Sequence, residues 1–318
     1  MGNITFSVII AVAPDRTPEV LDSLERQNYP RDSYEIIVKR GHNTSENRNS
    51  GVKEARGEYI AFVDDDAIVE PYWLKKAEEF FERYPEIDVV GGPQLTPPDE
   101  TTFGYASGIA LASVFGGASI RNRYRKGKLN LKSDERELTS ANIFCKKKVF
   151  EKVLFNKYFW PGEDPVFFNE LVRRGIKLAY CPDIYIYHRR RNTPVSLFKQ
   201  IFRYGYVRPK IKSIKKTHIS SSLFAVPSIF IVYLIFLPLL LISRKFFVLP
   251  LLIYILATII LSFTIAIKER KYKELLILPF VFFLIHIGYG TGFLCGLIRK
   301  LKGDKNGYRY KRNLQGLF

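Results

Sequence analysis

Three consecutive carboxylates, Asp64, Asp65 and Asp66, follow an apolar run at residues 59–63. The β-branched and aromatic side chains of that run predict a strand buried on both faces. In an open α/β sheet the ligand crevice lies outside the carboxyl ends of the strands, so these carboxylates would stand where a ligand binds. Carboxylates this close repel one another unless a cation is present, and their oxygens favour Mg²⁺ or Mn²⁺ shared with substrate phosphates. The alternative is an acidic turn whose charges are solvated.

A second pair of carboxylates, Glu163 and Asp164, stands directly before an amphipathic helix expected over residues 166–174. The helix macrodipole favours negative charge at a helix amino terminus. Taken alone, the pair is explained equally well by simple capping of that helix.

The apolar periodicity of the chain predicts the elements that position these residues. Strands are expected over residues 7–12, 35–38 and 59–63, with helices over 19–27 and 45–55 between them. Three strands joined by helical crossovers predict a βαβαβ nucleotide-binding half with a parallel sheet. Further along, helices are expected over 71–83 and 147–153, and strands over 88–93 and 140–144.

The net charge of +18 over 318 residues suggests an anionic partner. The basic residues gather beside apolar segments and in residues 121–128, so anionic lipid and a diphosphate explain them more economically than nucleic acid does. Residues 121–128 form either a mobile loop that meets phosphate or a solvated basic face, and the sequence leaves both interpretations open. Three scattered cysteines fit a reducing compartment.

Three nearly uncharged segments, residues 223–243, 246–267 and 275–298, are each long enough to cross about 30 Å of hydrocarbon. This pattern argues against a transporter or channel. A translocation path is usually lined by several ionisable residues, whereas His286 is the one ionisable residue well inside a segment. The small residues beside His286 favour helix packing over a functional role.

Residues 196–208 predict an amphipathic helix at an anionic membrane surface, with basic side chains beside its apolar face. The positive-inside rule places the basic residues of 210–216 and 268–271 in the cytosol. Three full crossings would then put the basic tail from Arg299 onward on the outer side. Either one segment is re-entrant or the rule fails here.

The motifs together resemble those of the inverting GT-A glycosyltransferases of family 2, in particular membrane-anchored members that build bacterial exopolysaccharides and archaeal lipid-linked glycans. The resemblance extends from residue 7 to about residue 208 and continues into the apolar segments. It is carried by the opening strand with its Pro14 turn, Arg48-Asn49-x-Gly51, residues 57–66, Glu163-Asp164 and Gln200-x-x-Arg203-Tyr204. The last is similar to the family's Gln-x-x-Arg-Trp box, with Tyr204 in the place of Trp. Each motif alone is weak, but their order and spacing are specific.

The resemblance implies a nucleotide-diphosphate sugar as donor and a divalent cation, Mn²⁺ or Mg²⁺, held by the family's Asp-x-Asp motif. That motif falls on Asp64 and Asp66, with Asp66 as the direct ligand. The family's catalytic base falls on Asp164, which would take the proton of an acceptor hydroxyl as its oxygen attacks the anomeric carbon and inverts it. Gln200 and Arg203 would close over the diphosphate.

By the same resemblance Pro14 and Arg48 belong to the donor site. In some relatives a histidine after the last strand completes the metal shell, and His188 either does so here or is an ordinary histidine at a strand end. Many relatives end the second strand in an Asp that reads the nucleotide, whereas this chain continues into Lys39 and Arg40. The resemblance therefore implies UDP only at the level of the family, with GDP second.

These interpretations give an α/β chain with four parts: a GT-A catalytic domain (1–194), an interfacial amphipathic helix (195–222), three transmembrane helices (223–298) and a basic tail (299–318). The expected function is transfer of a sugar to a hydroxyl of a lipid-linked or growing glycan, at the cytosolic face of the cell membrane. The expected partners are donor, acceptor and membrane lipids, without nucleic acid. The alternatives are a polyprenyl-phosphate monosaccharide synthase, in which Asp164 would be nearly dispensable, and a catalytically silent membrane scaffold.

Overall fold

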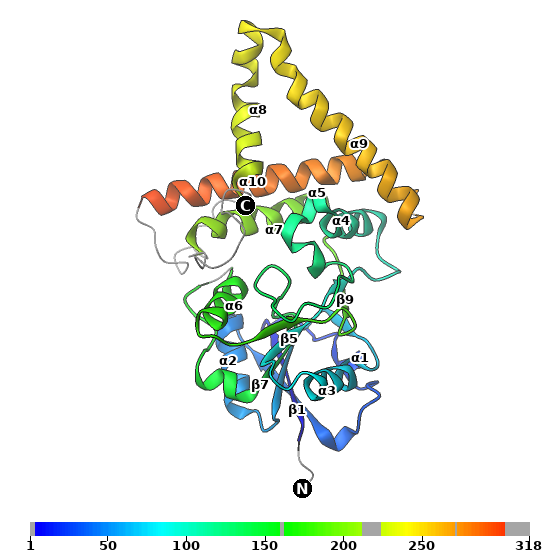
Figure 1. Ribbon diagram of the computed structural model, residues 1–318, viewed down its shortest axis with the longest axis vertical. Coiled ribbons are helices and arrows are strands. Elements are labelled where there is room, and N and C mark those ends of the chain that lie inside the picture. Colours follow the sequence, from blue (N-terminus) through cyan, green and yellow to red (C-terminus); the bar gives the residue numbers. More distant parts are fainter. Residues whose placement is uncertain (1–3, 160–161, 212–223, 271, 303–318) are drawn as a thin grey trace. The chain divides into compact units, whose positions relative to one another are not determined.

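The computed structural model describes residues 4–159, 162–211, 224–270 and 272–302 (Figure 1). These residues form two compact units, one of residues 4–97 with 119–189 and the other of residues 98–118 with 190–302. The domain boundaries expected from the sequence, at residues 194, 222 and 298, stay predictions.

The first unit is built on a six-stranded mixed sheet in the order β2-β1-β3-β7-β5-β8. Its strands are β1 (Phe6–Val12), β2 (Tyr34–Arg40), β3 (Tyr59–Asp64), β5 (Val89–Gly91), β7 (Asn142–Lys146) and β8 (Leu178–Tyr180). Strand β1 pairs in parallel with β2 and β3, which confirms the predicted parallel βαβαβ half. Strand β7 instead runs antiparallel to both β3 and β5.

A small second sheet continues from the end of β3. It has the order β4-β9-β6 and consists of β4 (Ala67–Val69), β6 (Gln94–Leu95) and β9 (Ile186–His188). Strand β4 begins directly after Asp66 and runs antiparallel to β9, with Ala67 opposite His188. This pairing brings together two segments that are more than a hundred residues apart in the sequence.

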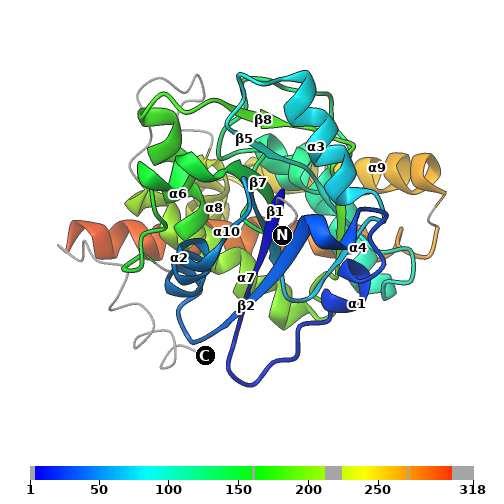
Figure 2. The ribbon, with the colours of Figure 1, turned by 90° about the horizontal axis from the view of Figure 1, so that it is seen from below.

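Helices cover both faces of the large sheet (Figure 2). One face carries α1 (Leu21–Leu24) and α3 (Trp73–Arg83), and the other carries α2 (Thr44–Glu54) and α6 (Glu163–Arg173). The side chains of β3 alternate between the two cores: Ala61 and Val63 pack with α3, whereas Ile60 and Phe62 pack with α2 and α6. All four are buried, so β3 is buried on both faces as predicted.

Three short 3-10 helices, Arg31–Ser33, Ala118–Arg123 and Lys147–Glu151, complete the connections of this part of the chain. The last replaces the helix predicted over 147–153. The helix predicted over 19–27 is only one turn long, because its flanking residues bond elsewhere. The backbone N–H of Val20 donates to the carbonyl of Asp65 at 3.1 Å, and the side chain of Gln27 donates to the carbonyl of Glu70 at 2.8 Å.

The second unit is helical. Its helices are α4 (Thr102–Ala112), α5 (Val114–Gly117), α7 (Pro194–Val207), α8 (Val226–Ser243), α9 (Leu249–Glu269) and α10 (Leu278–Leu301), with 3-10 turns at Arg208–Lys210 and Lys245–Val248. Three of the described helices, α8, α9 and α10, are long and apolar enough to cross a membrane, as the sequence predicts. The first predicted segment begins at Leu223, which lies outside the described residues. The sequence pattern missed α4 and α5.

The predicted amphipathic helix is α7, and its apolar side is buried within the second unit. His286 on α10 contacts the carbonyl of Phe115 through Nε2 at 2.9 Å and the hydroxyl of Tyr254 through Nδ1 at 2.8 Å. These contacts join α10 to α5 and α9, which agrees with the packing interpretation of His286.

Candidate active site

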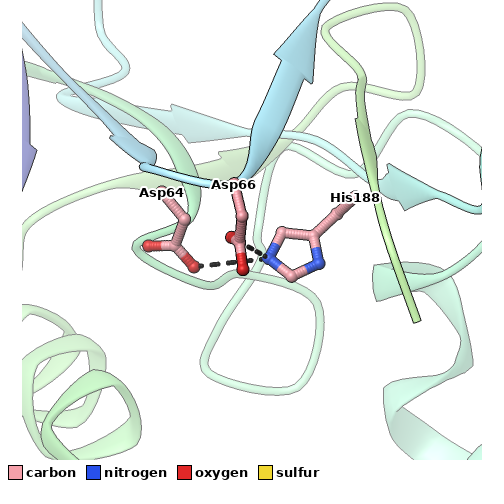
Figure 3. Close-up of side chains that lie close together, drawn as sticks. All are labelled: Asp64, Asp66 and His188. Atoms are coloured by element: carbon pink, nitrogen blue, oxygen red, sulfur yellow. Dashed lines mark ion pairs between the residues drawn. The ribbon is translucent and has the colours of Figure 1, made fainter. Parts of the chain in front are cut away.

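The acidic triplet lies where the two sheets meet. Asp64 is the last residue of β3, and Asp66 immediately precedes β4. Because β9 pairs with β4, the imidazole of His188 lies beside both carboxylates (Figure 3). Its Nε2 is 3.1 Å from Asp66 Oδ1 and 3.7 Å from Asp64 Oδ2. The structure thus brings together the three residues that the sequence proposed as metal ligands.

Their donor set suits a divalent cation. One ligand atom from each of Asp64, Asp66 and His188 lies within 4.8 Å of the others, a spacing that one ion can bridge. Carboxylate oxygens are ligands for Mg²⁺ and Mn²⁺, and a nitrogen ligand makes the set more suitable for Mn²⁺ than for Mg²⁺, which prefers oxygen alone. An acidic cluster of the Asp-x-Asp type is therefore present in the fold.

The charges of this cluster shift the pKa values of His188 and Asp66, so cation binding here depends on pH. Burial would lower the pKa of His188, but its hydrogen bonds to Asp64 and Asp66 raise that pKa to about 9. Burial would raise the pKa of Asp66, but the His188 hydrogen bond and the Arg16 charge hold it well below its usual range. Without a cation, a protonated His188 balances the two carboxylates at neutral pH. A cation that binds through Nε2 must displace that proton.

Arg16 is a member of this cluster that the sequence reasoning missed. It follows β1 in the same turn as Pro14, which is solvent-exposed. Its guanidinium is 3.2 Å from Asp65 Oδ1 and 3.1 Å from Asp66 Oδ2. The backbone carbonyl of Arg16 in turn accepts a 2.7 Å hydrogen bond from Arg40 at the end of β2. The loop after β1 is thereby joined to the carboxyl end of β2.

Arg48 links the triplet to the second acidic pair. It projects from α2 and its side chain is only 6% exposed. Its Nη2 is 3.2 Å from Asp64 Oδ1, and its Nη1 is 3.6 Å from both Glu163 Oε1 and Asp164 Oδ1. The guanidinium also lies over the ring of Phe155, 5.3 Å from its centroid. A single buried cation therefore lies between three carboxylates.

Asp164 is held in place from β7. Ser140, two residues before that strand, donates its backbone N–H to Asp164 Oδ2 at 3.1 Å, and its hydroxyl donates to Oδ1. Two donors from one residue fix the plane of the carboxylate, whose side chain keeps 24% of its surface exposed. Asp164 is thus oriented yet accessible.

Glu163 differs from its neighbour. It is the first residue of α6 and accepts a 3.1 Å hydrogen bond from the N–H of Gly162. Burial, together with the negative charge of Asp164, raises the pKa of Glu163 to about 7 in spite of Arg48. Near neutral pH Glu163 is therefore partly protonated, which limits the negative charge around Asp164.

The two remaining predicted site residues, Gln200 and Arg203, are on α7 in the second unit. Gln200 donates to the hydroxyl of Tyr204 at 3.1 Å, so the Gln-x-x-Arg-Tyr box is internally bonded. The Nε of Arg203 is buried and has no hydrogen-bond partner among the described residues. Their contact with a diphosphate stays a prediction.

The two interpretations of the basic stretch at residues 121–128 stay open, although two of its side chains contact other parts of the protein. Arg123 donates through Nε to the carbonyl of Arg136 at 3.1 Å, and Lys126 lies 3.9 Å from the ring centroid of Tyr185. These side chains are engaged with the protein.

Comparison with known proteins gives a family match that includes most of the first unit. Residues 9–154 match the family model described as Glycosyl transferase family 2. The chain is 25% identical over 313 positions (88% of this chain, 92% of the relative) to the dolichyl N-acetyl-alpha-D-glucosaminyl phosphate 3-beta-D-2,3-diacetamido-2,3-dideoxy-beta-D-glucuronosyltransferase of Methanococcus voltae. It is 23% identical over 193 positions to the minor teichoic acid biosynthesis protein GgaB of Bacillus subtilis (strain 168), which covers 59% of this chain but only 20% of GgaB.

Solved structures are also similar, at low identity. S. aureus TarS 1–349 in complex with UDP-GlcNAc matches with a TM-score of 0.46 and 15% identity, over 69% of each chain. The mannosyltransferase PcManGT from Pyrobaculum calidifontis, in complex with GDP-Man and Mn²⁺, matches with a TM-score of 0.46 and 14% identity, over 64% of this chain and 63% of that one. The family match, together with the mixed Rossmann-like sheet, confirms the predicted GT-A fold. Over residues 9–154 this chain is therefore similar to the glycosyl transferase family 2.

Proposed function

We propose that this protein transfers a sugar, with inversion, from a nucleotide-diphosphate donor to a hydroxyl of a lipid-linked glycan at the cytosolic face of a membrane. The observation that carries the proposal is Arg48, whose guanidinium lies between Asp64 of the metal-type cluster and Asp164 of the acidic pair. A donor whose diphosphate is bound beside Asp64 would have its anomeric carbon near Asp164. Donor binding and deprotonation of the acceptor would therefore take place in one site.

The donor end of the site would consist of Asp64, Asp66 and His188 around a divalent cation, Mn²⁺ or Mg²⁺. When bound, such a cation supplies Lewis-acid stabilisation of the charge that develops on the departing diphosphate. The loop residues Arg16 and Arg40 lie at the same sheet edge and add positive charge. Pro14 of that loop, and Gln200 and Arg203 on α7, are proposed to bind the donor on the ground of the family resemblance alone.

The acceptor end would use Asp164 as general base. Ser140 fixes the orientation of its carboxylate, and its remaining exposed surface gives an acceptor hydroxyl access to it. Asp164 takes the hydroxyl proton while the acceptor oxygen forms its bond to the anomeric carbon and the bond to the diphosphate breaks. Attack from the face opposite the leaving group inverts that carbon.

A hydroxyl acceptor is favoured over a polyprenyl phosphate. A phosphate oxygen is already a nucleophile and needs no base, whereas this site holds a carboxylate oriented for proton transfer. The Methanococcus voltae relative is named for action on a dolichyl N-acetylglucosaminyl phosphate at a sugar position, which supports a lipid-linked sugar as acceptor class. UDP is the first choice of donor nucleotide and GDP the second. The apolar helices of the second unit support a membrane location.

The decisive experiment is the variant Asp164→Asn in the full-length protein. Sugar transfer from a radiolabelled donor to membrane lipid extract is expected to be abolished, while calorimetry shows UDP binding with Mn²⁺ at the wild-type affinity. The matched control, Asp183→Asn, removes an exposed carboxylate that forms no ion pair with the described site residues, and it should leave transfer unchanged. Full transfer activity in Asp164→Asn would refute the base role and favour the polyprenyl-phosphate reaction.

A panel of UDP- and GDP-sugars, each assayed with and without Mn²⁺, would identify the donor. The absence of both transfer and metal-dependent donor hydrolysis across the panel would favour a silent scaffold over an enzyme. Asp66→Asn serves here as the companion variant, since it should lose metal-dependent donor binding and Asp164→Asn should not.

A further inference from the structure

The amphipathic helix α7 and the apolar helix α10 touch through their backbones. Gly288, Gly292 and Gly296 recur every four residues along one side of α10. A Cβ atom at Gly292 would collide with the carbonyl oxygen of Phe202 on α7, and one at Gly296 would collide with the carbonyl of Tyr206. Small residues at such spacing allow two helices to pack at the closest approach.

The same contacts show that the two helices run side by side in the same direction. The glycine at 288 faces Phe198, the one at 292 faces Phe202 and the one at 296 faces Tyr206, so each four-residue step on α10 matches a four-residue step on α7. Beyond the last of these, Lys300 Nζ donates to the carbonyl of Pro209 at 2.6 Å. The contact therefore extends over the whole second half of α10, and the two helices share one orientation.

Helix α7 is unsuited to crossing a bilayer. Its 14 residues give a length of about 21 Å, against about 30 Å of hydrocarbon. It carries Lys199 and Arg203 near its middle, and each such charge costs about 2.5–3.5 kcal/mol at the centre of a membrane helix. An amphipathic helix of this kind lies in the plane of the interface. Since α10 is packed along α7, α10 must lie in that plane too.

Helices α8 and α9 are arranged differently. The first turns of α8 meet the middle of α10, where Ser228 Oγ donates to the carbonyl of Gly290 at 3.3 Å. From there α8 leaves α10 at a steep angle, since α10 is seen along its length in both views while α8 is seen lengthwise only in Figure 1. Helix α9 returns toward the level of α10 (Figure 1). Ile235 and Ile242 of α8 are 64% and 83% exposed, and Ile253 of α9 is 66% exposed, as expected of side chains that face lipid.

We propose that only α8 and α9 cross the bilayer, as a hairpin, and that α7 and α10 lie together in the cytosolic interface against anionic lipid headgroups. Charge supports this arrangement. The turn between α8 and α9 carries Arg244 and Lys245. A larger basic set lies at or just after the carboxyl ends of α7, α9 and α10: Arg208, Lys210, Lys268, Arg270, Lys273, Arg299, Lys300 and Lys302. Two crossings keep the whole set on one side and return the basic tail to the cytosol. The conflict between three crossings and the positive-inside rule disappears.

Sidedness is the first test, and it uses no turnover, so its result is independent of the proposed transferase activity. In a background with Cys145, Cys181 and Cys295 changed to alanine, single cysteines are placed in the tail (Gln315→Cys), the first unit (Glu86→Cys) and the hairpin turn (Lys245→Cys). A membrane-impermeant maleimide should label the first two in inverted vesicles and the third in right-side-out vesicles. Labelling of Gln315→Cys on the side of Lys245→Cys would overturn the proposal.

Depth is the second test, because sidedness alone does not identify which helix lies in the plane. Spin labels at positions 280, 287 and 298 share one face of α10, since their spacings are close to whole helical turns at about 100° per residue. In vesicles with 30% phosphatidylglycerol, an in-plane α10 gives similar depths at all three positions. A crossing α10 would place the label at 287 about 10 Å deeper than the label at 280, which would refute the proposal.

Positions 229, 236 and 243 on α8 are the matched control. They are seven residues apart, so they also share one face, and they lie on a helix expected to cross; the middle label should therefore be the deepest. A flat profile on α8 would also overturn the hairpin.

Discussion

Replacing Arg48 with methionine tests the electrostatic design of the site most directly. Methionine keeps much of the side-chain length and the contact with Phe155 but removes the charge. The guanidinium is 3.2 Å from Asp64 and 3.6 Å from Glu163 and Asp164, and it is almost fully buried. Its loss leaves three carboxylates facing one another without a buried counter-charge.

The size of the effect follows from the burial. Removing one partner of a buried ion pair costs about 3–5 kcal/mol, because the charge left behind is uncompensated. For a domain of 150–250 residues this corresponds to a fall in Tm of about 6–20 °C, at about 2–4 °C per kcal/mol. The fall should be measurable by intrinsic fluorescence of the detergent-purified protein.

The pH dependence has a defined sign. The pKa of Glu163 in the folded protein is raised to about 7, so its contribution to stability is present below its unfolded pKa and is lost as the pH rises through 7. Arg48 lowers that pKa, so in Arg48→Met it rises further and the loss continues to higher pH. The Tm difference between variant and wild type should therefore be smaller at pH 5, where only Asp64 and Asp164 lose a counter-charge, than at pH 8, where Glu163 loses one too.

Arg173→Met is the matched control, because Arg173 pairs with Glu170 on the exposed side of α6. An exposed pair contributes little, so the Tm of this variant should stay close to that of the wild type at every pH. A Tm difference for Arg48→Met that shrinks as the pH rises, or that matches the control, would refute the reasoning.

Three further outcomes are expected. In calorimetry without nucleotide, Mn²⁺ affinity should rise about tenfold per pH unit from pH 7 to about 9, because Mn²⁺ displaces the His188 proton, and His188→Gln should abolish this slope. Ser140→Ala should lower kcat about 10- to 100-fold with an unchanged donor KM, since a hydrogen bond to the charged Asp164 contributes about 1.5–3 kcal/mol, and Ser140→Thr should restore it. Gly292→Ala should lower Tm because its new Cβ collides with the Phe202 carbonyl, whereas Cys295→Ala, at an exposed position of the same helix, should not.

The buried strand and its acidic end were predictable because both are local signals. The run at residues 59–63 is apolar on both faces, and the aspartates follow it directly, so β3 and the position of Asp64 at the sheet edge come from one short stretch. Helix α2 with Arg48 is equally local. These local stretches do not indicate which residue pairs with each charged side chain. The link from Arg48 to Asp164 joins residues 116 positions apart, and no periodicity encodes it.

Ser140 was missed for a topological reason. If all strands of the sheet were parallel, a residue that precedes a strand would lie at the edge opposite the ligand crevice. Strand β7 is antiparallel to β3, with Val63 opposite Asn142, so its beginning lies beside the end of β3. The direction of β7 depends on the long connection before it, and this direction decides that Ser140 reaches Asp164.

His188 shows why the sequence left two interpretations open. Side chains alternate between the faces of a strand, so a shift of one residue in the pairing of β9 with β4 would turn His188 away from Asp66. The register that places Ala67 opposite His188 is supported by Asn142, whose side chain donates to the carbonyl of Ile184 at 2.8 Å just before β9. The position of His188 therefore depends both on the pairing of β9 with β4 and β6 and on a buried amide on a different strand, so a test of that amide also tests the metal site. Asn142→Leu should weaken Mn²⁺ binding although it removes no ligand.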